Sequence, residues 1–345
     1  MDQVLKEFGF DAQGYKVQLH GSGLINHTWV VENGEEKFIL QKVNDKVFKR
    51  PQDIASNISA IDDYLKEHHK DYFFTTQHKT LAGDNFLFLE NDGYYRAFPF
   101  VKDSHSIDVV ETPQQAYEAA KQFGRFTKLL SGIDIGELKI TLPDFHDLSL
   151  RFTQYQQALQ NGNKERIEHC KTFIEKLNGY AYIADEYEAI KKNPGFRLRV
   201  THHDTKISNV LFDDNDKGIC VIDLDTVMPG YFISDLGDMM RTYLSPVSEE
   251  EKDYSKIEIR DEFYKAIVKG YKEEMGDELT ETENDHFFYA GTFMIYMQAL
   301  RFITDHLNND IYYGAKYDGH NFVRGGNQIT LLEKLTEKKQ ALSQV

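Results

Sequence analysis

The sequence predicts an α+β protein with two lobes, a small β-rich lobe at residues 1–101 and a larger helical lobe at residues 102–345. In the first lobe, short stretches alternate apolar and polar side chains and are separated by glycine-containing turns, which is typical of half-buried strands. In the second lobe, apolar residues recur at the spacing of one helix face. A chain of 345 residues is also longer than one ordinary domain.

The β-rich lobe is expected to contain strands that are joined mainly by tight turns. These strands are predicted at 15–19, 28–31, 37–43, 86–89 and 95–101. Asn33-Gly34 and Asn91-Asp92-Gly93 are typical of the turns of β-hairpins. Between the third and fourth strands, a helix is predicted from Pro51 to about Lys66, because its isoleucines and Leu65 fall on one stripe.

The first helix of the helical lobe is expected to begin just after Thr112. Thr112 and Gln115 form a capping box, and Pro113 stands at the first helical position. Alanines, Phe123 and Leu130 then recur at helical spacing. Further helices are predicted at 147–160, 163–192, 250–275 and 280–307, and a short strand-rich segment is predicted at 198–227.

The composition restricts the partners of the protein. Lys and Arg number 40 against 56 Asp and Glu, so the net charge is -16. This acidic field repels nucleic acid and anionic membranes, and we expect neither as a partner. Two cysteines, no signal peptide and no long apolar run favour a cytoplasmic protein. We expect a monomer or a weak homodimer that acts on a small molecule.

The strongest chemical motif lies in the segment 198–227. His202, Asp204 and Asn209 have the spacing His-x-Asp-x-x-x-x-Asn, and an apolar strand that follows ends at Asp223. A chance match of the three fixed positions is expected in roughly 2% of chains of this length. The strand and its terminal Asp223 make a chance match rarer still.

These residues resemble the phosphotransferase family that includes aminoglycoside phosphotransferases and choline kinases. The resemblance implies a protein-kinase-like two-lobe fold, a nucleotide-binding first lobe, and transfer of the γ-phosphoryl of ATP with Mg²⁺ as cofactor. It implies that Asp204 is the catalytic base and that Asn209 and Asp223 bind Mg²⁺. Lys206 could stabilise the transferred phosphoryl or could be a solvated surface lysine. His202 is expected to support the loop by hydrogen bonding.

The resemblance also places the nucleotide in the first lobe. The candidate nucleotide-binding residues occupy a glycine turn, the strands beside it and the link to the second lobe; they are Gly21, Ser22, Gly23, Asn26, Thr28, Gln41, Phe98 and Phe100. Glycines allow the backbone to approach phosphate closely. Gln41 departs from the family, whose third strand usually carries a Lys or Arg that reaches the phosphates. We therefore expect metal, loop amides and Lys206 to supply more of the positive charge.

Further segments resemble the N-acetylhexosamine 1-kinase branch of that family, among them residues 23–28, 223–230, 235–241, 300–307 and 320–324. The similarity spans about residues 15 to 330. This similarity implies phosphorylation of the anomeric hydroxyl of an amino sugar. The candidate substrate-binding residues are Asp225, Arg241, Arg301, Asp305, Tyr312 and Arg324. Two alternatives remain open: Arg301 and Asp305 could form an ion pair on one helix face, and Asp225 could join Asp223 at the metal.

Other functions are compatible with parts of this pattern. A phosphotransferase acting on aminoglycosides or other small alcohols would suit the acidic surface. A non-catalytic pseudokinase is disfavoured because Asp204, Asn209 and Asp223 are all present. A protein kinase is disfavoured because no Asp-Phe-Gly segment follows Asp204.

Overall fold

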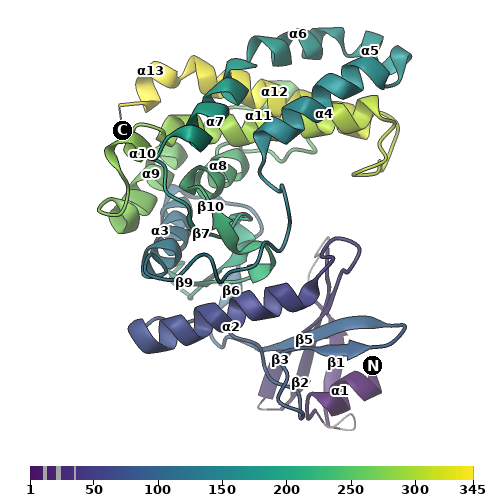
Figure 1. Cartoon of the computed structure of the whole chain (residues 1–345), viewed down its shortest axis with the longest axis vertical. Helices are drawn as coiled ribbons and strands as arrows, with labels where there is room; N and C mark the ends of the chain where they lie inside the picture. The colour runs from purple at the N-terminus through teal and green to yellow at the C-terminus, as the bar shows by residue number, and fades with distance from the viewer. Residues whose placement is uncertain (11–13, 21–24, 35, 345) are drawn as a thin grey trace.

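The computed structural model describes the whole chain except residues 11–13, 21–24, 35 and 345. Figure 1 shows a small antiparallel sheet at one end of the molecule and a larger, mainly helical lobe at the other. The predicted α+β class and the order of the two lobes are confirmed. Among the described residues, none of the helices combines the length and apolar character that crossing a membrane requires.

The sheet of the small lobe has the strand order β1-β2-β3-β5-β4, and every neighbouring pair is antiparallel. Its strands are β1 (Lys16–Leu19), β2 (His27–Asn33), β3 (Glu36–Val43), β4 (Leu87–Leu89) and β5 (Gly93–Pro99). All five lie within two residues of their predicted starts and ends. The β2–β3 hairpin turns at Gly34, whose φ of +56° favours glycine.

A short helix that the sequence pattern does not predict completes the small lobe. α1 (Asp2–Glu7) packs Val4 and Leu5 into a separate small core with Val31 and Leu40 of the sheet. A helix of six residues shows little more than one turn of periodicity, so its pattern carries almost no signal.

The helix α2 (Pro51–His68) links the two lobes. Its predicted apolar stripe is buried, but it packs into the large core of the helical lobe rather than into the core of the sheet. Figure 1 shows α2 between the sheet and the second lobe. Asn57 of α2 donates hydrogen bonds to the carbonyls of Lys139 and Val227, 2.8 and 3.0 Å away.

The helical lobe is built around α11 (Phe287–Leu307), which packs against α8 (Phe232–Tyr243), α12 (His320–Glu337) and α4 (Leu148–Asn161). Beside it, α3 (Pro113–Leu129) lies along α9 (Asp261–Met275). The remaining helices are α5 (Lys164–His169), α6 (Lys171–Gly179), α7 (Tyr182–Lys192), α10 (Glu281–Asn284) and α13 (Lys339–Leu342). The capping box of Thr112 and Gln115 is confirmed.

Three predicted helices are corrected. The helix expected at 163–192 is three helices, interrupted at Cys170 and near Tyr180. The helix expected at 250–275 begins only at Asp261, after the 3₁₀ turn η3 (Tyr254–Lys256). The helix expected at 280–307 is interrupted near Asp285. Helix ends are set by local backbone hydrogen bonding, which periodicity alone does not reveal.

The strand-rich segment is confirmed and forms two small sheets. β7 (Arg199–Thr201) pairs with β10 (Met228–Gly230), and β8 (Val210–Phe212) lies between β6 (His105–Ser106) and β9 (Gly218–Val221). Two 3₁₀ turns connect them, η1 (Ile207–Asn209) and η2 (Leu224–Thr226).

Candidate active site

The loop that carries Asp204 is held in place by α8. Asp235, a fully buried residue of α8, accepts backbone N–H groups on both carboxylate oxygens, from His203 at 2.7 Å and from His202 at 2.8 Å. His203 has a φ of +65°, in the left-handed region that side chains rarely adopt. Two backbone hydrogen bonds to a buried carboxylate can hold such a conformation.

A second carboxylate of α8 holds the next residue of the loop. Asp238 accepts the N–H of Thr205 at 2.8 Å, and the Thr205 hydroxyl donates to the carbonyl of Asp235 at 2.7 Å. Tyr243, also of α8, donates to the carbonyl of Thr205 at 2.6 Å. Asp204 therefore projects from a backbone that is fixed on both sides of it. The sequence signal for this role is Asp235-x-x-Asp238 on one helix face, but only the packing shows what that face contacts.

Asp204 lies beside a lysine and an asparagine of its own loop. The Nζ of Lys206 is 3.1 Å from Oδ2 of Asp204, and the Asp204 side chain is 26% exposed. Burial alone would lower the pKa of Lys206, but the negative charges of Asp204 and Asp223 have the larger combined effect. The pKa of the lysine is therefore raised. Asn209 donates its side-chain N–H to the carbonyl of Asp204 at 2.8 Å. The amide oxygen of Asn209 therefore remains available to a cation.

Asp223 reaches the same place from β9. The β8–β9 pairing sets Val210 opposite Val221, and the N–H of Ile222 donates to the carbonyl of Asn209 at 2.9 Å. The turn at Asp223 has a φ of +61°, and its side chain is exposed. Crowding by surrounding protein atoms and the negative charges of Asp225 and Asp204 raise the Asp223 pKa.

His202 has the supporting position expected from the sequence. It is fully buried, and its Nε2 lies 2.9 Å from the carbonyl of Ile222. This contact ties the Asp204 loop to the residue before Asp223. Burial lowers the pKa of His202, so the neutral ring is favoured.

Asp225 connects the two lobes. Its Oδ1 lies 2.5 Å from a guanidinium nitrogen of Arg96 in β5, and its Oδ2 accepts the side-chain N–H of Asn26 at 2.7 Å. Asp225 and Arg96 are both nearly inaccessible to solvent. Neither the metal-binding nor the sugar-binding alternative describes this contact, in which Asp225 is an ion-pair partner of the small lobe.

Arg96 is a candidate that sequence reasoning missed. Gln41 faces it across the β3–β5 pairing, and Nε of Arg96 donates to Oε1 of Gln41 at 3.0 Å. Gln41 in turn donates to the hydroxyl of Thr28 at 3.3 Å. A buried cation therefore lies next to the position where the family usually has a strand lysine. Only strand pairing reveals this, because the two residues are 55 positions apart.

The other predicted nucleotide-binding residues are placed only in part. Gly21, Ser22 and Gly23 lie outside the described residues. Phe98 and Phe100 lie at the end of β5 and just beyond it, half-buried, with the Arg96 guanidinium over the Phe98 ring. The N–H of Phe100 donates to the carbonyl of Lys37 at 2.9 Å, so this N–H is not free for a ligand.

A second polar region lies on α11 and the segment that follows it. Arg301 lies 5.3–5.9 Å from the rings of Phe145, Tyr312 and Tyr313, and it donates to Gln298 at 3.2 Å. The ion pair considered for Arg301 and Asp305 is absent among the described contacts. Asp305 instead accepts the N–H groups of Tyr312 and Tyr313 at 2.7 and 2.9 Å. It positions the segment after α11.

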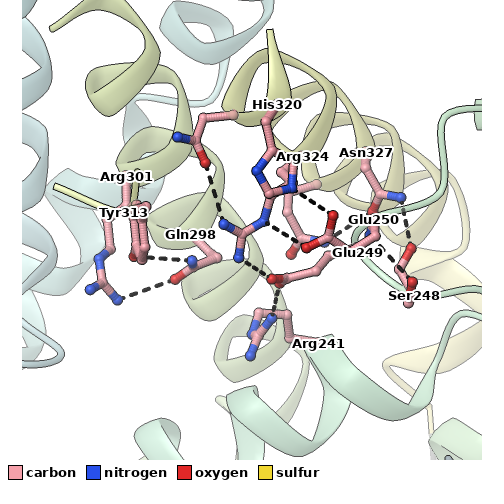
Figure 2. A network of polar contacts seen from close by, with 12 residues as sticks. Arg241, Ser248, Glu249, Glu250, Gln298, Arg301, Tyr313, His320, Arg324 and Asn327 are labelled. Atoms are coloured by element: carbon pink, nitrogen blue, oxygen red, sulfur yellow. Dashed lines mark hydrogen bonds and ion pairs between the residues drawn. The ribbon is translucent and has the colours of Figure 1, made fainter. Parts of the chain in front are cut away.

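Arg241 and Arg324 share one carboxylate. Figure 2 shows Glu249 between them, accepting Arg241 on one oxygen at 2.8 Å and Arg324 on the other. Arg241 also donates to Asp238 at 3.0 and 3.1 Å. Burial lowers the pKa of Arg241, but Asp238 and Glu249 outweigh it and raise that pKa. These two arginines therefore join α8, α12 and the segment containing Glu249.

Two aromatic contacts connect this region with the loop of Asp204. The rings of Phe145 and His146 stack 4.4 Å apart, and His146 lies 5.3 Å from the ring of His203, the residue before Asp204. Arg301 faces the Phe145 ring. Burial, followed by the charges of His203 and Arg301, lowers the His146 pKa well below its usual value.

The donor set around Asp204 suits a cation that also binds phosphate. Across the described part of the chain, no group of three or more His, Cys, Asp or Glu side chains forms a metal site of its own. The side-chain oxygens of Asn209 and Asp223 are the available ligands. Mg²⁺ commonly takes one or two protein ligands and completes its shell with water and substrate phosphates. The residues present therefore fit Mg²⁺ bound together with a nucleotide.

Comparison with solved structures identifies related folds. An aminoglycoside phosphotransferase from Alicyclobacillus acidocaldarius has a TM-score of 0.68 at 11% identity, covering 100% of this chain and 97% of that chain. A choline kinase from Cryptosporidium parvum has a TM-score of 0.56 at 13% identity, covering 96% and 92%. An amicoumacin kinase in complex with AMP-PNP, Ca²⁺ and Ami has a TM-score of 0.58 at 13% identity, covering 96% and 93%.

These neighbours confirm the protein-kinase-like two-lobe fold. A family sequence model matches residues 16–279 of the chain, a range that includes both Asp204 and Asp223. This match is evidence from the sequence itself, in addition to the similarity of fold. The chain belongs to the phosphotransferase enzyme family.

Proposed function

We propose that this protein transfers the γ-phosphoryl of ATP to a sugar hydroxyl, the anomeric hydroxyl of an N-acetylhexosamine. The observation that carries the proposal is the juxtaposition of Asp204, Asn209 and Asp223 on a backbone that α8 fixes from one side. Phosphoryl transfer depends mainly on positioning and on charge stabilisation, and this arrangement serves both.

In the proposed reaction, Asp204 orients the acceptor hydroxyl and takes its proton. As the new bond between the acceptor oxygen and the γ-phosphorus forms, the bond to the leaving ADP oxygen breaks. Lys206, 3.1 Å from Asp204, keeps a positive charge beside the transferred group. Asn209 and Asp223 would hold Mg²⁺, which neutralises phosphate charge. Crowding by protein atoms, followed by the charges of Asp225 and Asp204, raises the pKa of Asp223, and a bound cation would offset those charges.

For the nucleotide, we propose that Arg96 supplies the charge that Gln41 lacks. Its guanidinium contacts Gln41 and Asp225, and Asp225 also accepts a hydrogen bond from Asn26. The buried cation is thus linked to the strand position of Gln41 and, through Asp225, to Asn26 and the segment after Asp223. Gly21, Ser22, Gly23 and Thr28 remain the proposed phosphate-side residues, and Phe98 and Phe100 the proposed adenine-side residues.

For the acceptor, we propose a site at Arg301 and Tyr312. Tyr312 is 70% exposed and offers a planar face, and Arg301 offers donors that no carboxylate among the described residues occupies. Arg241, Arg324 and Asp305 are engaged with protein groups, so we propose that they position this site rather than contact the sugar directly.

A kinase for cationic aminoglycosides or small amino alcohols is the second candidate. The similar folds of an aminoglycoside phosphotransferase and a choline kinase, together with the acidic net charge, favour it. The arginine-rich surroundings of Phe145 and Tyr312 favour the sugar instead, because they repel a cationic acceptor.

Transfer of radiolabelled phosphate from ATP to a panel of acceptors separates these functions. We expect labelled product with N-acetylhexosamines, and little with plain hexoses, choline or kanamycin. Label on kanamycin or choline alone would favour the second candidate and contradict the sugar assignment.

A further inference from the structure

A cavity of about 420 Å³ lies between α4 and the C-terminal half of α11. It is lined by residues that include Arg151, Gln154, Arg301, Thr304, Asp305 and Tyr312. A second cavity of about 650 Å³ adjoins it, because Asn161, Asp305, Asn308 and Tyr312 line both. Together they are large enough for a sugar with a substituent.

Two arginines face this cavity with only neutral hydrogen-bond partners. Arg151 donates to Gln154 at 3.1 Å and to the carbonyl of Asp144 at 2.8 Å. Arg301 donates to Gln298 at 3.2 Å. Within the described residues, neither guanidinium forms an ion pair with a carboxylate. This is unusual in a chain with a net charge of -16, where acidic side chains outnumber basic ones.

Two buried polar atoms of the lining have no hydrogen-bond partner in the described structure. They are Nε of Arg151 and the hydroxyl oxygen of Thr304. Leaving such atoms unpaired inside a protein costs free energy, and buried polar groups are nearly always satisfied. A ligand rich in oxygen atoms would accept from Arg151 and exchange a hydrogen bond with Thr304.

The charge of the cavity is positive. Among the described residues, Asp305 is the one carboxylate of its lining, and both of its oxygens already accept backbone N–H groups. Burial and then the positive charge of Arg301 lower the pKa of Arg151, so the two guanidinium groups are close enough to repel each other. A neutral sugar would satisfy hydrogen bonds here but would leave this repulsion in place.

We propose that Arg151 and Arg301 form a subsite for an oxyanion carried by the acceptor, a carboxylate, sulfate or phosphate substituent on the sugar. This inference rests on the proposed function, since it refines the acceptor class of the same site. Arginine pairs bind such groups through several charge-assisted hydrogen bonds at once. Phosphorylation takes place at the hydroxyl beside Asp204, and the substituent occupies the cavity beside Arg151.

Acceptor kinetics test the subsite. We would measure kcat/KM for N-acetylglucosamine and for its 6-sulfate and 6-phosphate, with wild type, Arg151→Gln and Arg125→Gln. Arg125 of α3 is a matched control, because it is half-buried and forms no ion pair among the described residues. Its guanidinium lies over the ring of Tyr72. Melting temperatures confirm that each variant is folded.

We expect wild type to prefer an anionic acceptor, and Arg151→Gln to lower the ratio of anionic to neutral kcat/KM by about tenfold or more. Arg125→Gln should leave this ratio unchanged. A wild-type preference for the neutral sugar, or an equal loss for both acceptors in Arg151→Gln, would overturn the proposal.

Calorimetry with inorganic phosphate, in saturating MgADP, separates an acceptor-borne anion from a free one. Phosphate binding that weakens in Arg151→Gln, together with the anionic preference, supports the subsite as proposed. If phosphate binding weakens in Arg151→Gln but wild type prefers neutral acceptors, the site binds a free anion. This result would overturn the proposal that the anion is a substituent of the acceptor. The same binding in a protein that phosphorylates no sugar would overturn the proposed function and leave the oxyanion site standing.

Discussion

At the level of single residues, the candidate catalytic set is largely readable from the chain. The spacing of His202, Asp204 and Asn209 and the strand that ends at Asp223 indicate the chemistry, and the fold brings these residues together. Arg96 was not readable, because its partners are Gln41 on another strand and Asp225 in another lobe. Likewise, Arg241 and Arg324 resemble sugar ligands in sequence, whereas each is paired with Glu249.

Replacing Arg96 should affect the nucleotide rather than the sugar. Arg96→Met removes the buried cation beside Gln41, and we expect the KM for ATP to rise about tenfold or more while the KM for the sugar stays nearly constant. It also leaves the charge of Asp225 unpaired, which costs about 3–5 kcal/mol of stability. Arg96→Lys should recover part of both losses. Steady-state kinetics and urea unfolding measure them.

Glu283→Gln is the control for this loss of stability. It breaks another buried ion pair, with Arg199, in which both side chains are almost inaccessible. It should lower stability without changing the KM for ATP. If both variants raised that KM equally, Arg96 would have only a structural role.

Replacing Arg301 should have the opposite effect on the two substrates. Arg301→Ala removes donors at the proposed acceptor site, so the KM for the sugar should rise roughly tenfold or more, with the KM for ATP nearly constant. Substrate titrations with each ligand in turn provide the comparison. A change in the ATP value alone would move Arg301 to the phosphate site.

At the level of elements, α8 explains why the loop of Asp204 has a fixed shape. Asp235, Asp238 and Tyr243 all lie on it, and together they bind the backbone of His202, His203 and Thr205. The sequence shows these side chains at helical spacing but cannot show that they point at a loop 32–38 residues earlier. The interruptions of the helices at 163–192 and 280–307 are also not visible in the periodicity, because helix ends are set by local hydrogen bonding.

Asp235→Asn should therefore impair turnover without removing any group that touches substrate. One side of the amide is a donor and faces a backbone N–H, so a hydrogen bond to His202 or His203 is lost. We expect about 1–3 kcal/mol lower stability and a lower kcat, with smaller changes in both KM values. Asp261→Asn, at a partly exposed ion pair with Lys338, should leave kcat unchanged. An unchanged kcat in Asp235→Asn would mean that α8 does not control the loop.

At the level of the whole molecule, the chain has two separate hydrophobic cores, and the boundary between them does not follow the order of strands and helices along the sequence. The small core holds α1 and the sheet, whereas α2 packs with the helical lobe although it precedes β4 and β5. Sequence periodicity identified the buried face of α2 but not the lobe that buries it. Asp225 of the helical lobe contacts Asn26 and Arg96 of the small lobe and so joins the two.

The buried histidines should make the protein sensitive to acid. Burial, followed by the charge of Arg166, lowers the pKa of His306 from 6.5 to about 4. A depressed histidine pKa means that the unfolded state takes up the proton first, so this stabilisation is present above pH 6.5 and is lost as the pH falls towards 4. The loss cannot exceed about 1.4 kcal/mol per pH unit for one histidine.

Urea unfolding from pH 7.5 to 4.5 should show this loss in wild type and a shallower slope in His306→Asn. Parallel slopes for the two proteins would mean that His306 titrates normally in the folded state. Conditions at each pH must be matched in ionic strength, because exposed ion pairs respond to salt.

The most direct test of the central claim is transfer of radiolabelled γ-phosphate to an N-acetylhexosamine by wild type and by Asp204→Asn. We expect wild type to form a labelled sugar 1-phosphate only with Mg²⁺, and Asp204→Asn to be slower by about 10²–10⁴ while still binding MgADP. Asp204→Asn removes the base and leaves Asn209 and Asp223 in place. No labelled product from any N-acetylhexosamine, or a turnover in Asp204→Asn of about a third of wild type or more, would contradict the account.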